Sequence, residues 1–160
     1  MRKRKRNTRT LLKLHKEIIN GARNLKPFTC PTNKDHAGAI GMIIEKKLIS
    51  NVHGRNESDV HKLELKTKNI DSKSLISLAK YTNPVDTFNR TYKKVKDNLL
   101  LIYWKQVKDK IHLVRSELYS NLDKGDFATY TNFIRRKGEV DCRVSANNLV
   151  RLYETKNIYE

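Results

Sequence analysis

The apolar residues near the start of the chain recur at helical spacing. Leu11, Leu14 and Ile18 stand at positions i, i+3 and i+7, so one face of this segment is hydrophobic. Such a pattern is typical of an amphipathic helix. We expect the helix to end near Gly21, because glycine readily adopts the left-handed conformation that closes a helix. The prolines and asparagine that follow mark residues 27–34 as a loop.

A second helix is predicted over residues 37–49, where an apolar stripe repeats every four positions. The stripe consists of Ile40, Ile44 and Leu48. On another face, Gly38, Gly41 and Glu45 stand at i, i+3 and i+7, so two residues without side chains lie beside one carboxylate. A glycine inside a helix costs up to about 1 kcal/mol relative to alanine. This cost indicates that another group approaches the helix backbone closely on that face.

Residues 62–67 alternate strictly between polar and apolar positions, which predicts a β-strand. Leu63 and Leu65 point to one side of the strand. Glu64 and Lys66 point to the other side, because side chains alternate along a strand. The strand therefore presents an acid and a base together on one face.

The remaining patterns complete an α/β chain. Helices are predicted over residues 71–81, 116–122 and 145–155, and strands over residues 99–104 and 127–134. The segment 99–104 is a continuous apolar run, which is typical of a buried central strand. Strands that alternate with helices favour a single α/β domain with a central mixed β-sheet flanked by helices.

The charge of the chain points to an anionic partner. Among 160 residues, 34 are Lys or Arg and 17 are Asp or Glu, so the formal net charge is +17. Such a charge attracts polyanions, and nucleic acid is the favoured partner. The alternatives are assembly with an acidic protein, or lysines that only keep the chain soluble. We divide the chain into a basic arm, residues 1–9, and one domain, residues 10–160.

The basic arm is expected to remain mobile until it meets phosphate. It contains five positive charges within residues 2–6. It could follow the phosphates of a nucleic acid, or it could equally be a localisation signal.

Several other classes are disfavoured. No apolar stretch is long enough to cross a membrane, and no signal peptide is expected. Cys30 and Cys142 lie far apart, and only His36 stands near either of them, so a zinc site is not expected. We expect reduced thiols and an intracellular, DNA-associated protein, cytoplasmic in a prokaryotic cell.

Asp59, Glu64 and Lys66 form the pattern Asp-x4-Glu-x-Lys, whose residue types suit phosphodiester hydrolysis. Two carboxylates about 4 Å apart repel by roughly 4 kcal/mol at an effective dielectric constant of 20, so they need a cation between them. Mg²⁺ fits because it takes oxygen ligands, and Mn²⁺ is expected to substitute. Lys66 would hold or help deprotonate the attacking water. The alternative is a surface ion pair on an exposed strand.

The motif around these residues resembles the MutH family, which comprises a mismatch-repair nicking endonuclease and related type II restriction enzymes. The resemblance rests on the helix segment 38–45, then Asp59, then the strand segment 63–67. It implies the PD-(D/E)xK nuclease fold and a magnesium-dependent endonuclease. Within that resemblance, Glu45 is a helix acid that assists the metal, Asp59 and Glu64 bind it, and Lys66 is the catalytic lysine. Family members typically read GATC.

The family also has a lysine shortly before an apolar strand. Lys94 is the best match for it, and Lys93 is nearly as good. Either would place a positive charge near the phosphate, although a solvated lysine in a basic helix has the same pattern.

Contacts to DNA are expected from a basic turn after the strand predicted at 127–134. The candidate residues are Arg135, Arg136, Lys137 and Arg143. Two guanidinium groups beside a glycine suit a loop that enters a groove or clamps phosphate. A turn with solvated charges would have the same sequence, and phosphate positioning is favoured over base readout.

Together these patterns predict a magnesium-dependent endonuclease of double-stranded DNA, of the type II restriction or MutH kind. One alternative is a non-catalytic basic protein that binds or packages DNA. Another keeps the same site in a nickase for repair or for junctions. Cutting both strands calls for two sites, as in a two-fold homodimer, but the sequence shows no interface.

Overall fold

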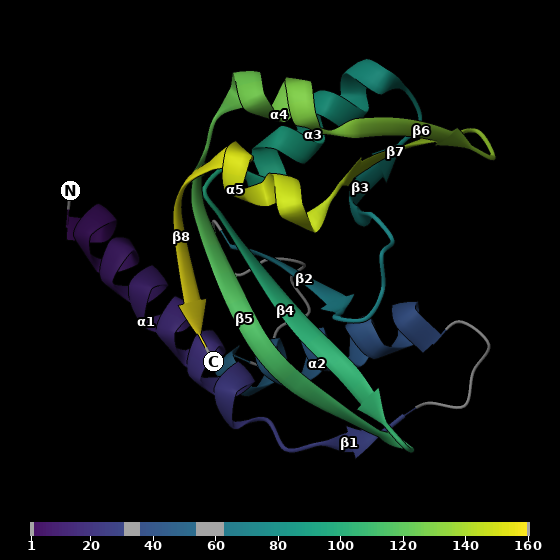
Figure 1. Cartoon of the computed structure of the whole chain (residues 1–160). Coiled ribbons are helices and arrows are strands. Elements are labelled where there is room, and N and C mark those ends of the chain that lie inside the picture. Colours follow the sequence, from purple (N-terminus) through teal and green to yellow (C-terminus); the bar gives the residue numbers. More distant parts are fainter. Residues whose placement is uncertain (1, 31–35, 54–62, 160) are drawn as a thin grey trace.

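The chain folds around a central mixed β-sheet with helices and a smaller sheet packed against it (Figure 1). The structure is a computed structural model, and it describes residues 2–30, 36–53 and 63–159. The predicted layout of a mixed sheet flanked by helices is therefore confirmed.

The central sheet has the strand order β1-β5-β4-β2, and β8 also pairs with β5. Its strands are β1 (Phe28–Thr29), β5 (Lys110–Leu122), β4 (Asn98–Val107), β2 (Glu64–Asn69) and β8 (Tyr153–Tyr159). Strand β2 runs parallel to β4, and the other pairs are antiparallel. The predicted strand at 62–67 thus lies at an edge of the sheet, next to the predicted strand at 99–104.

Strand β4 divides the hydrophobic core into two clusters. Residues 99–104 of this strand are all buried, as the continuous apolar run predicts. Leu100, Ile102 and Trp104 pack with helices α1 (Arg2–Asn24) and α2 (His36–His53). Their neighbours along the strand face the other way and join the second cluster. Both faces of the sheet are therefore covered, which fixes β2 firmly beside β4.

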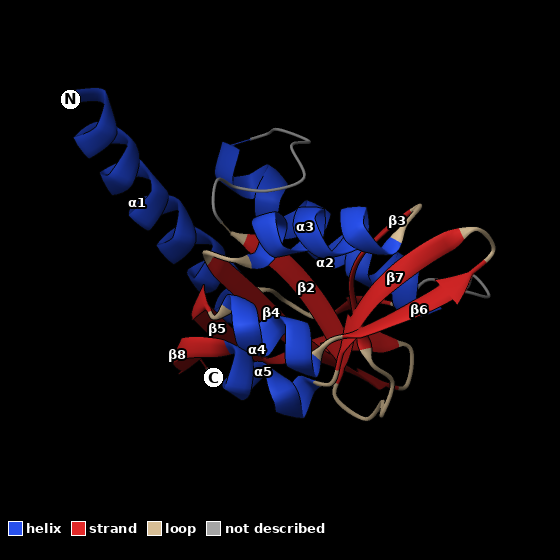
Figure 2. Cartoon of the chain, turned by 90° about the horizontal axis from the view of Figure 1, so that it is seen from above, coloured by secondary structure: helices blue, strands red, loops and turns tan. Residues whose placement is uncertain are grey.

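The second cluster lies under a smaller antiparallel sheet of order β3-β7-β6. Its strands are β3 (Ile76–Tyr81), β7 (Glu139–Val144) and β6 (Asn132–Arg136). Three helices accompany this sheet: α3 (Pro84–Val95), α4 (Lys124–Tyr130) and α5 (Leu149–Leu152). Figure 2 shows the β6–β7 hairpin extending outward from this part of the molecule.

The first helix is longer than the sequence predicts. Helix α1 begins at Arg2, so the backbone of the basic arm is helical, and it ends at Asn24. Gly21 lies inside it and does not cap it. A side-chain carbon added at Gly21 would lie 3.4 Å from Leu48 Cδ2, so Gly21 lies on the side of α1 that faces α2.

The helix predicted at 71–81 is wrong, because residues 76–81 form strand β3. Ile76 and Leu78 are buried, while Ser77 between them is exposed, as the period of a strand requires. The pairing register with β7 shifts between Ser77 and Ala79. This irregularity breaks the apolar alternation, so the pattern resembles that of a helix.

Three predictions in the second half also need correction. Residues 116–122, predicted as a helix, are the end of β5, where the buried charge of Glu117 interrupts the apolar pattern. The strand predicted from Phe127 begins only at Asn132, because the Asp123 side chain accepts a hydrogen bond from Asp126 N and caps α4. In the segment 145–155, predicted as one helix, the chain forms a short 3₁₀ turn (Ala146–Asn148) and α5, and β8 follows.

None of the helices in the described part of the chain is long and apolar enough to cross a membrane. Cys30 and Cys142 are buried, and neither forms a disulfide bond within the described residues. Burial is the main reason why the pKa of Cys142 rises to about 12, so this thiol stays protonated.

Candidate active site

Strand β2 holds Glu64 and Lys66 on one face, as predicted. Glu64 pairs with Leu99 and Lys66 with Leu101, and both leucines belong to the core cluster on the side of α3. Leu65 packs in the opposite cluster with α2. Residues two apart on a strand are separated by about 6.6 Å along the backbone, so the two side chains leave the same face of β2 at neighbouring positions.

The carboxylate of Glu64 is buried next to a lysine of helix α3. Glu64 is only 3% exposed, and its Oε2 lies 3.4 Å from Lys94 Nζ. A buried carboxylate is costly unless a cation balances it, and Lys94 supplies that charge here. Lys93, the other candidate, is exposed on the same helix. The structure thus brings Lys94 to Glu64.

Tyr153 adds a neutral neighbour to the buried carboxylate. Its hydroxyl donates a hydrogen bond to Val95 O at 2.7 Å. Burial, and then the negative charge of Glu64, raise the pKa of Tyr153 above its usual value. This tyrosine therefore stays protonated and adds no negative charge beside Glu64.

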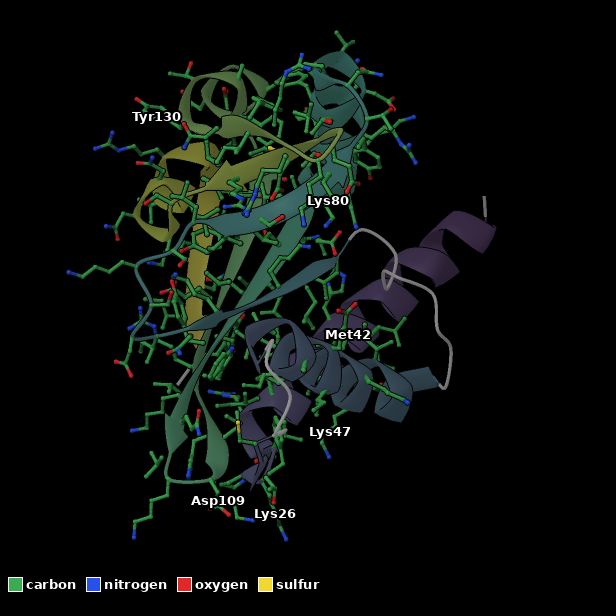
Figure 3. All side chains as sticks on the ribbon, turned by 90° about the vertical axis from the view of Figure 1, so that its right-hand side faces the viewer. Lys26, Met42, Lys47, Lys80, Asp109 and Tyr130 are labelled. Carbon is green, nitrogen blue, oxygen red and sulfur yellow. The ribbon has the colours of Figure 1, made fainter. Side chains whose placement is uncertain are left out.

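A cleft of about 380 Å³ opens where α2, β2 and the start of β3 meet. Glu45 from α2 and Lys66 from β2 both line it, together with Ser77 from β3. Met42 lies on the helix side of this cleft, and Figure 3 shows it below Lys80 of β3. The cleft has room for a phosphate and its neighbouring sugar, and it joins the predicted helix acid to the predicted catalytic lysine.

The glycine face of α2 is explained by Thr67 on β2. A side-chain carbon added at Gly41 would lie 2.8 Å from Thr67 Oγ1, which is too close for a real contact. The expectation that a group approaches the helix backbone is therefore confirmed at Gly41. This close approach sets the distance between α2, which carries Glu45, and β2, which carries Lys66.

The variant Gly41→Ala should lower the free energy of unfolding by about 1–2 kcal/mol. Overpacking costs about 1–3 kcal/mol, and the better helix propensity of alanine returns up to about 1 kcal/mol. In a Thr67→Ala background the clash is gone, so the same change should be neutral or stabilising. Denaturant unfolding of the four proteins measures this coupling. Equal effects in both backgrounds would show that Thr67 is not the cause.

Sequence reasoning missed Lys68, which also lines the cleft. Its Nζ donates a hydrogen bond to Ser74 O at 2.7 Å, and burial lowers its pKa. The signal was available, because Lys68 continues the alternation of Glu64 and Lys66 on the same strand face. Ser77 was missed as well, because the segment around it was predicted to be helical.

Arg135, Arg136 and Lys137 lie on the β6–β7 hairpin and are exposed. Lys137 and Gly138 have φ angles of 50° and 80°, and Arg136 pairs with Glu139 across the turn. Two positive φ angles in a two-residue loop make a tight hairpin turn. The turn thus presents its cationic side chains to solvent.

Arg143 lies on β7 and not on this turn. Its Nε donates to Asp141 Oδ2 at 2.7 Å, and Ser77 Oγ donates to Asp141 Oδ1 at 2.6 Å. Asp141 is 7% exposed, so this group of three side chains is well ordered by burial. Ser77 joins it to the wall of the cleft.

The described residues supply only part of a ligand set for a hard divalent cation. Glu45 and Glu64 offer carboxylate oxygens, which Mg²⁺ prefers. Asp59, the predicted third ligand, lies outside the described residues. Within residues 2–30, 36–53 and 63–159, no three His, Cys, Asp or Glu side chains gather closely enough to hold a metal ion. The types of ligand fit magnesium, and a complete set requires Asp59.

Comparisons with known proteins agree with this architecture. The chain is similar to a solved structure described as "Restriction endonuclease MvaI-cognate DNA substrate complex", with a TM-score of 0.62 and 12% identity over 92% of this chain and 97% of that chain. A second structure, "Restriction endonuclease MvaI in the absence of DNA", has a TM-score of 0.46 and 14% identity over 93% of this chain and 100% of that chain. No family model matches the sequence, and no curated protein does. The first likeness shows a restriction-endonuclease-like α/β fold, while the resemblance to MutH itself stays a prediction.

Proposed function

We propose that this chain is a magnesium-dependent endonuclease that hydrolyses phosphodiester bonds in duplex DNA at the cleft between α2 and β2. The proposal rests mainly on one observation. Glu64 and Lys66 share one strand face, and Lys66 lines a cleft with Glu45. The restriction-endonuclease-like fold and the formal charge of +17 support the same conclusion.

In this proposal Glu64 and Asp59 bind the metal ion, and Glu45 assists from the helix. A bound Mg²⁺, or Mn²⁺ in its place, would polarise the scissile phosphate and lower the pKa of a bound water. Lys66 holds the attacking water or accepts its proton, because it lines the cleft with Glu45 and shares a strand face with Glu64. These roles agree with those that the resemblance to the MutH family implies.

In the same proposal, Lys94 both stabilises the buried Glu64 carboxylate and attracts DNA phosphate. Its ammonium group balances the buried charge of Glu64, at 3.4 Å in the structure. Its side chain is 28% exposed, so the ammonium group can also attract a DNA phosphate. Lys93, which is exposed on the same helix, would contact the backbone farther from the reacting group.

The DNA would be held by the basic hairpin and by Arg143. Arg135, Arg136 and Lys137 are exposed on the β6–β7 turn, where they would contact DNA phosphates. The similar solved structure with the TM-score of 0.62 is a complex with a cognate DNA substrate, which supports DNA as the ligand of this chain too.

Incubation of supercoiled plasmid with the protein and Mg²⁺ tests this function. We expect discrete products, with binding but no cleavage when Ca²⁺ replaces Mg²⁺. Linear product would indicate cutting of both strands, and open circles would indicate a nickase. Sequencing the cleaved ends would show whether the site is GATC or another.

Strong binding that falls steeply with salt, is indifferent to sequence and leads to no cleavage in Mg²⁺ or Mn²⁺ would contradict this function. That result would favour the alternative, in which the chain is a basic protein that binds or packages DNA.

A further inference from the structure

The sheet β3-β7-β6 has one apolar face and one polar face. Val140, Cys142 and Val144 of β7 are buried in the core, so the residues between them point away from it. Two residues of β7, Asp141 and Arg143, therefore lie on the polar face. The pairing register places Ser77 of β3 directly beside Arg143, and Ser77 lines the cleft. The polar face thus meets the proposed DNA site.

On this face the guanidinium group of Arg143 is fixed in one orientation. Its Nε donates to Asp141 Oδ2 at 2.7 Å, and the other carboxylate oxygen accepts the Ser77 hydroxyl at 2.6 Å. Because Asp141 is 7% exposed, the carboxylate cannot turn away to bind water instead. The planar guanidinium group is therefore held through one edge.

The other edge of the same group is available for a ligand. In the described part of the chain, the ion pair of Arg143 is with Asp141 and uses Nε. The N–H groups of Nη1 and Nη2 are therefore available as donors. Its side chain is 27% exposed. Two coplanar donors match a pair of acceptors in one plane, such as O6 and N7 of guanine in the major groove. A strand pair such as β6–β7 also fits that groove.

Phosphate binding does not require this arrangement. Arg135 and Arg136 are exposed on the hairpin and form no ion pair within the described residues, which suits mobile contacts to a flexible backbone. A buried acid that orients Arg143 instead restricts the direction of its donors. Such a restriction favours recognition of a DNA base, because the acceptors on its edge have a fixed plane and spacing.

We infer that Arg143 is a specificity-determining residue that reads a guanine of the duplex DNA bound at the cleft. Asp141 and Ser77 are positioning residues that orient its guanidinium group. This inference rests on the proposed function only in taking duplex DNA as the ligand. It adds base readout to a residue for which the sequence favours phosphate positioning.

The variant Arg143→Lys separates base readout from phosphate binding, because it keeps the charge and loses the planar pair of donors. The probe is a pool of DNA duplexes with a randomised central segment, bound in Ca²⁺ and cleaved in Mg²⁺, with selected and cleaved molecules sequenced. Wild type should prefer guanine at one position. In Arg143→Lys this preference should fall roughly 5- to 150-fold, whereas a lost phosphate contact weakens all sequences equally.

Two further variants complete the experiment. Arg90→Lys is the matched control, because Arg90 also pairs with an acid, Asp86, but lies on α3 outside the cleft lining. It should keep the preference of wild type. Ser77→Ala removes one hydrogen bond from Asp141 and should weaken the preference in the same direction by a smaller factor. It gives a second readout if Arg143→Lys fails to fold.

An unchanged preference in Arg143→Lys would overturn the inference. So would a wild type that selects no sequence, and in that case cleavage of the pool in Mg²⁺ would still uphold the proposed nuclease. A guanine preference that is present in wild type and lost in Arg143→Lys, without any cleavage in Mg²⁺, would uphold guanine recognition by Arg143. The same result would contradict the proposed hydrolysis.

Discussion

Replacing Lys66 with alanine should slow DNA cleavage by about 10²- to 10⁴-fold, the range for a side chain that moves a proton in the transition state. Lys66 lines the cleft with Glu45 and lies on the strand face of Glu64. Alanine can neither hold the attacking water nor accept its proton. Asp59→Ala should abolish cleavage, because it removes a proposed metal ligand.

Single-turnover cleavage and DNA binding in Ca²⁺ together measure this effect. Binding by Lys66→Ala should change little, because many other cations contribute to it. Lys105→Ala is the matched control, since Lys105 is an exposed lysine of β4 outside the cleft lining. Equal cleavage rates for the two variants would remove Lys66 from the catalytic site.

The second large effect is expected for Glu64→Gln, which should reduce cleavage by about 10³-fold, comparable to the loss of a group that stabilises transition-state charge. The amide is a poor ligand for Mg²⁺ and carries no charge. Without metal, however, the free energy of unfolding should change by only about 1 kcal/mol. The variant removes a buried charge together with its ion pair, and Lys94, at 28% exposure, can turn to solvent.

Thermal unfolding with and without Mg²⁺ separates these two consequences. At 100 times its dissociation constant, a bound ion stabilises the folded state by about 2.7 kcal/mol. Wild type should show this rise, and Glu64→Gln should not. Glu117→Gln is a matched control, because Glu117 is also a buried carboxylate, 3.2 Å from Arg115, but belongs to β5 outside the site. A normal Mg²⁺ response in Glu64→Gln would contradict its role as a ligand.

Local periodicity predicts the parts of the site that lie on β2 and α2. The alternation around Glu64 identifies a strand face, and the face with Gly41 and Glu45 identifies a helix that another group approaches. Both depend only on residues within one element, where the spacing of side chains is fixed by backbone geometry. The buried run of β4 is predicted for the same reason.

Contacts between distant segments could not be read in this way. Ser77 and Asp141 are 64 residues apart and meet only because β3 pairs with β7. The irregular register at Ser77 also made the segment look helical, which hid the strand that brings it to the cleft. In β5, the buried Glu117 is stabilised by Tyr119 and Arg115 after folding, and no local pattern indicates such partners.

The most direct test of the proposed site is to locate a divalent ion in a crystal of the protein with duplex DNA. Mn²⁺ can be identified there by its anomalous scattering. We expect an ion bound by carboxylate oxygens of Glu64 and Asp59, next to a DNA phosphate, with Lys66 Nζ directed at the same phosphate or its attacking water. An ion bound elsewhere, or DNA seated away from the β2 cleft with Glu64 still paired with Lys94, would contradict this expectation.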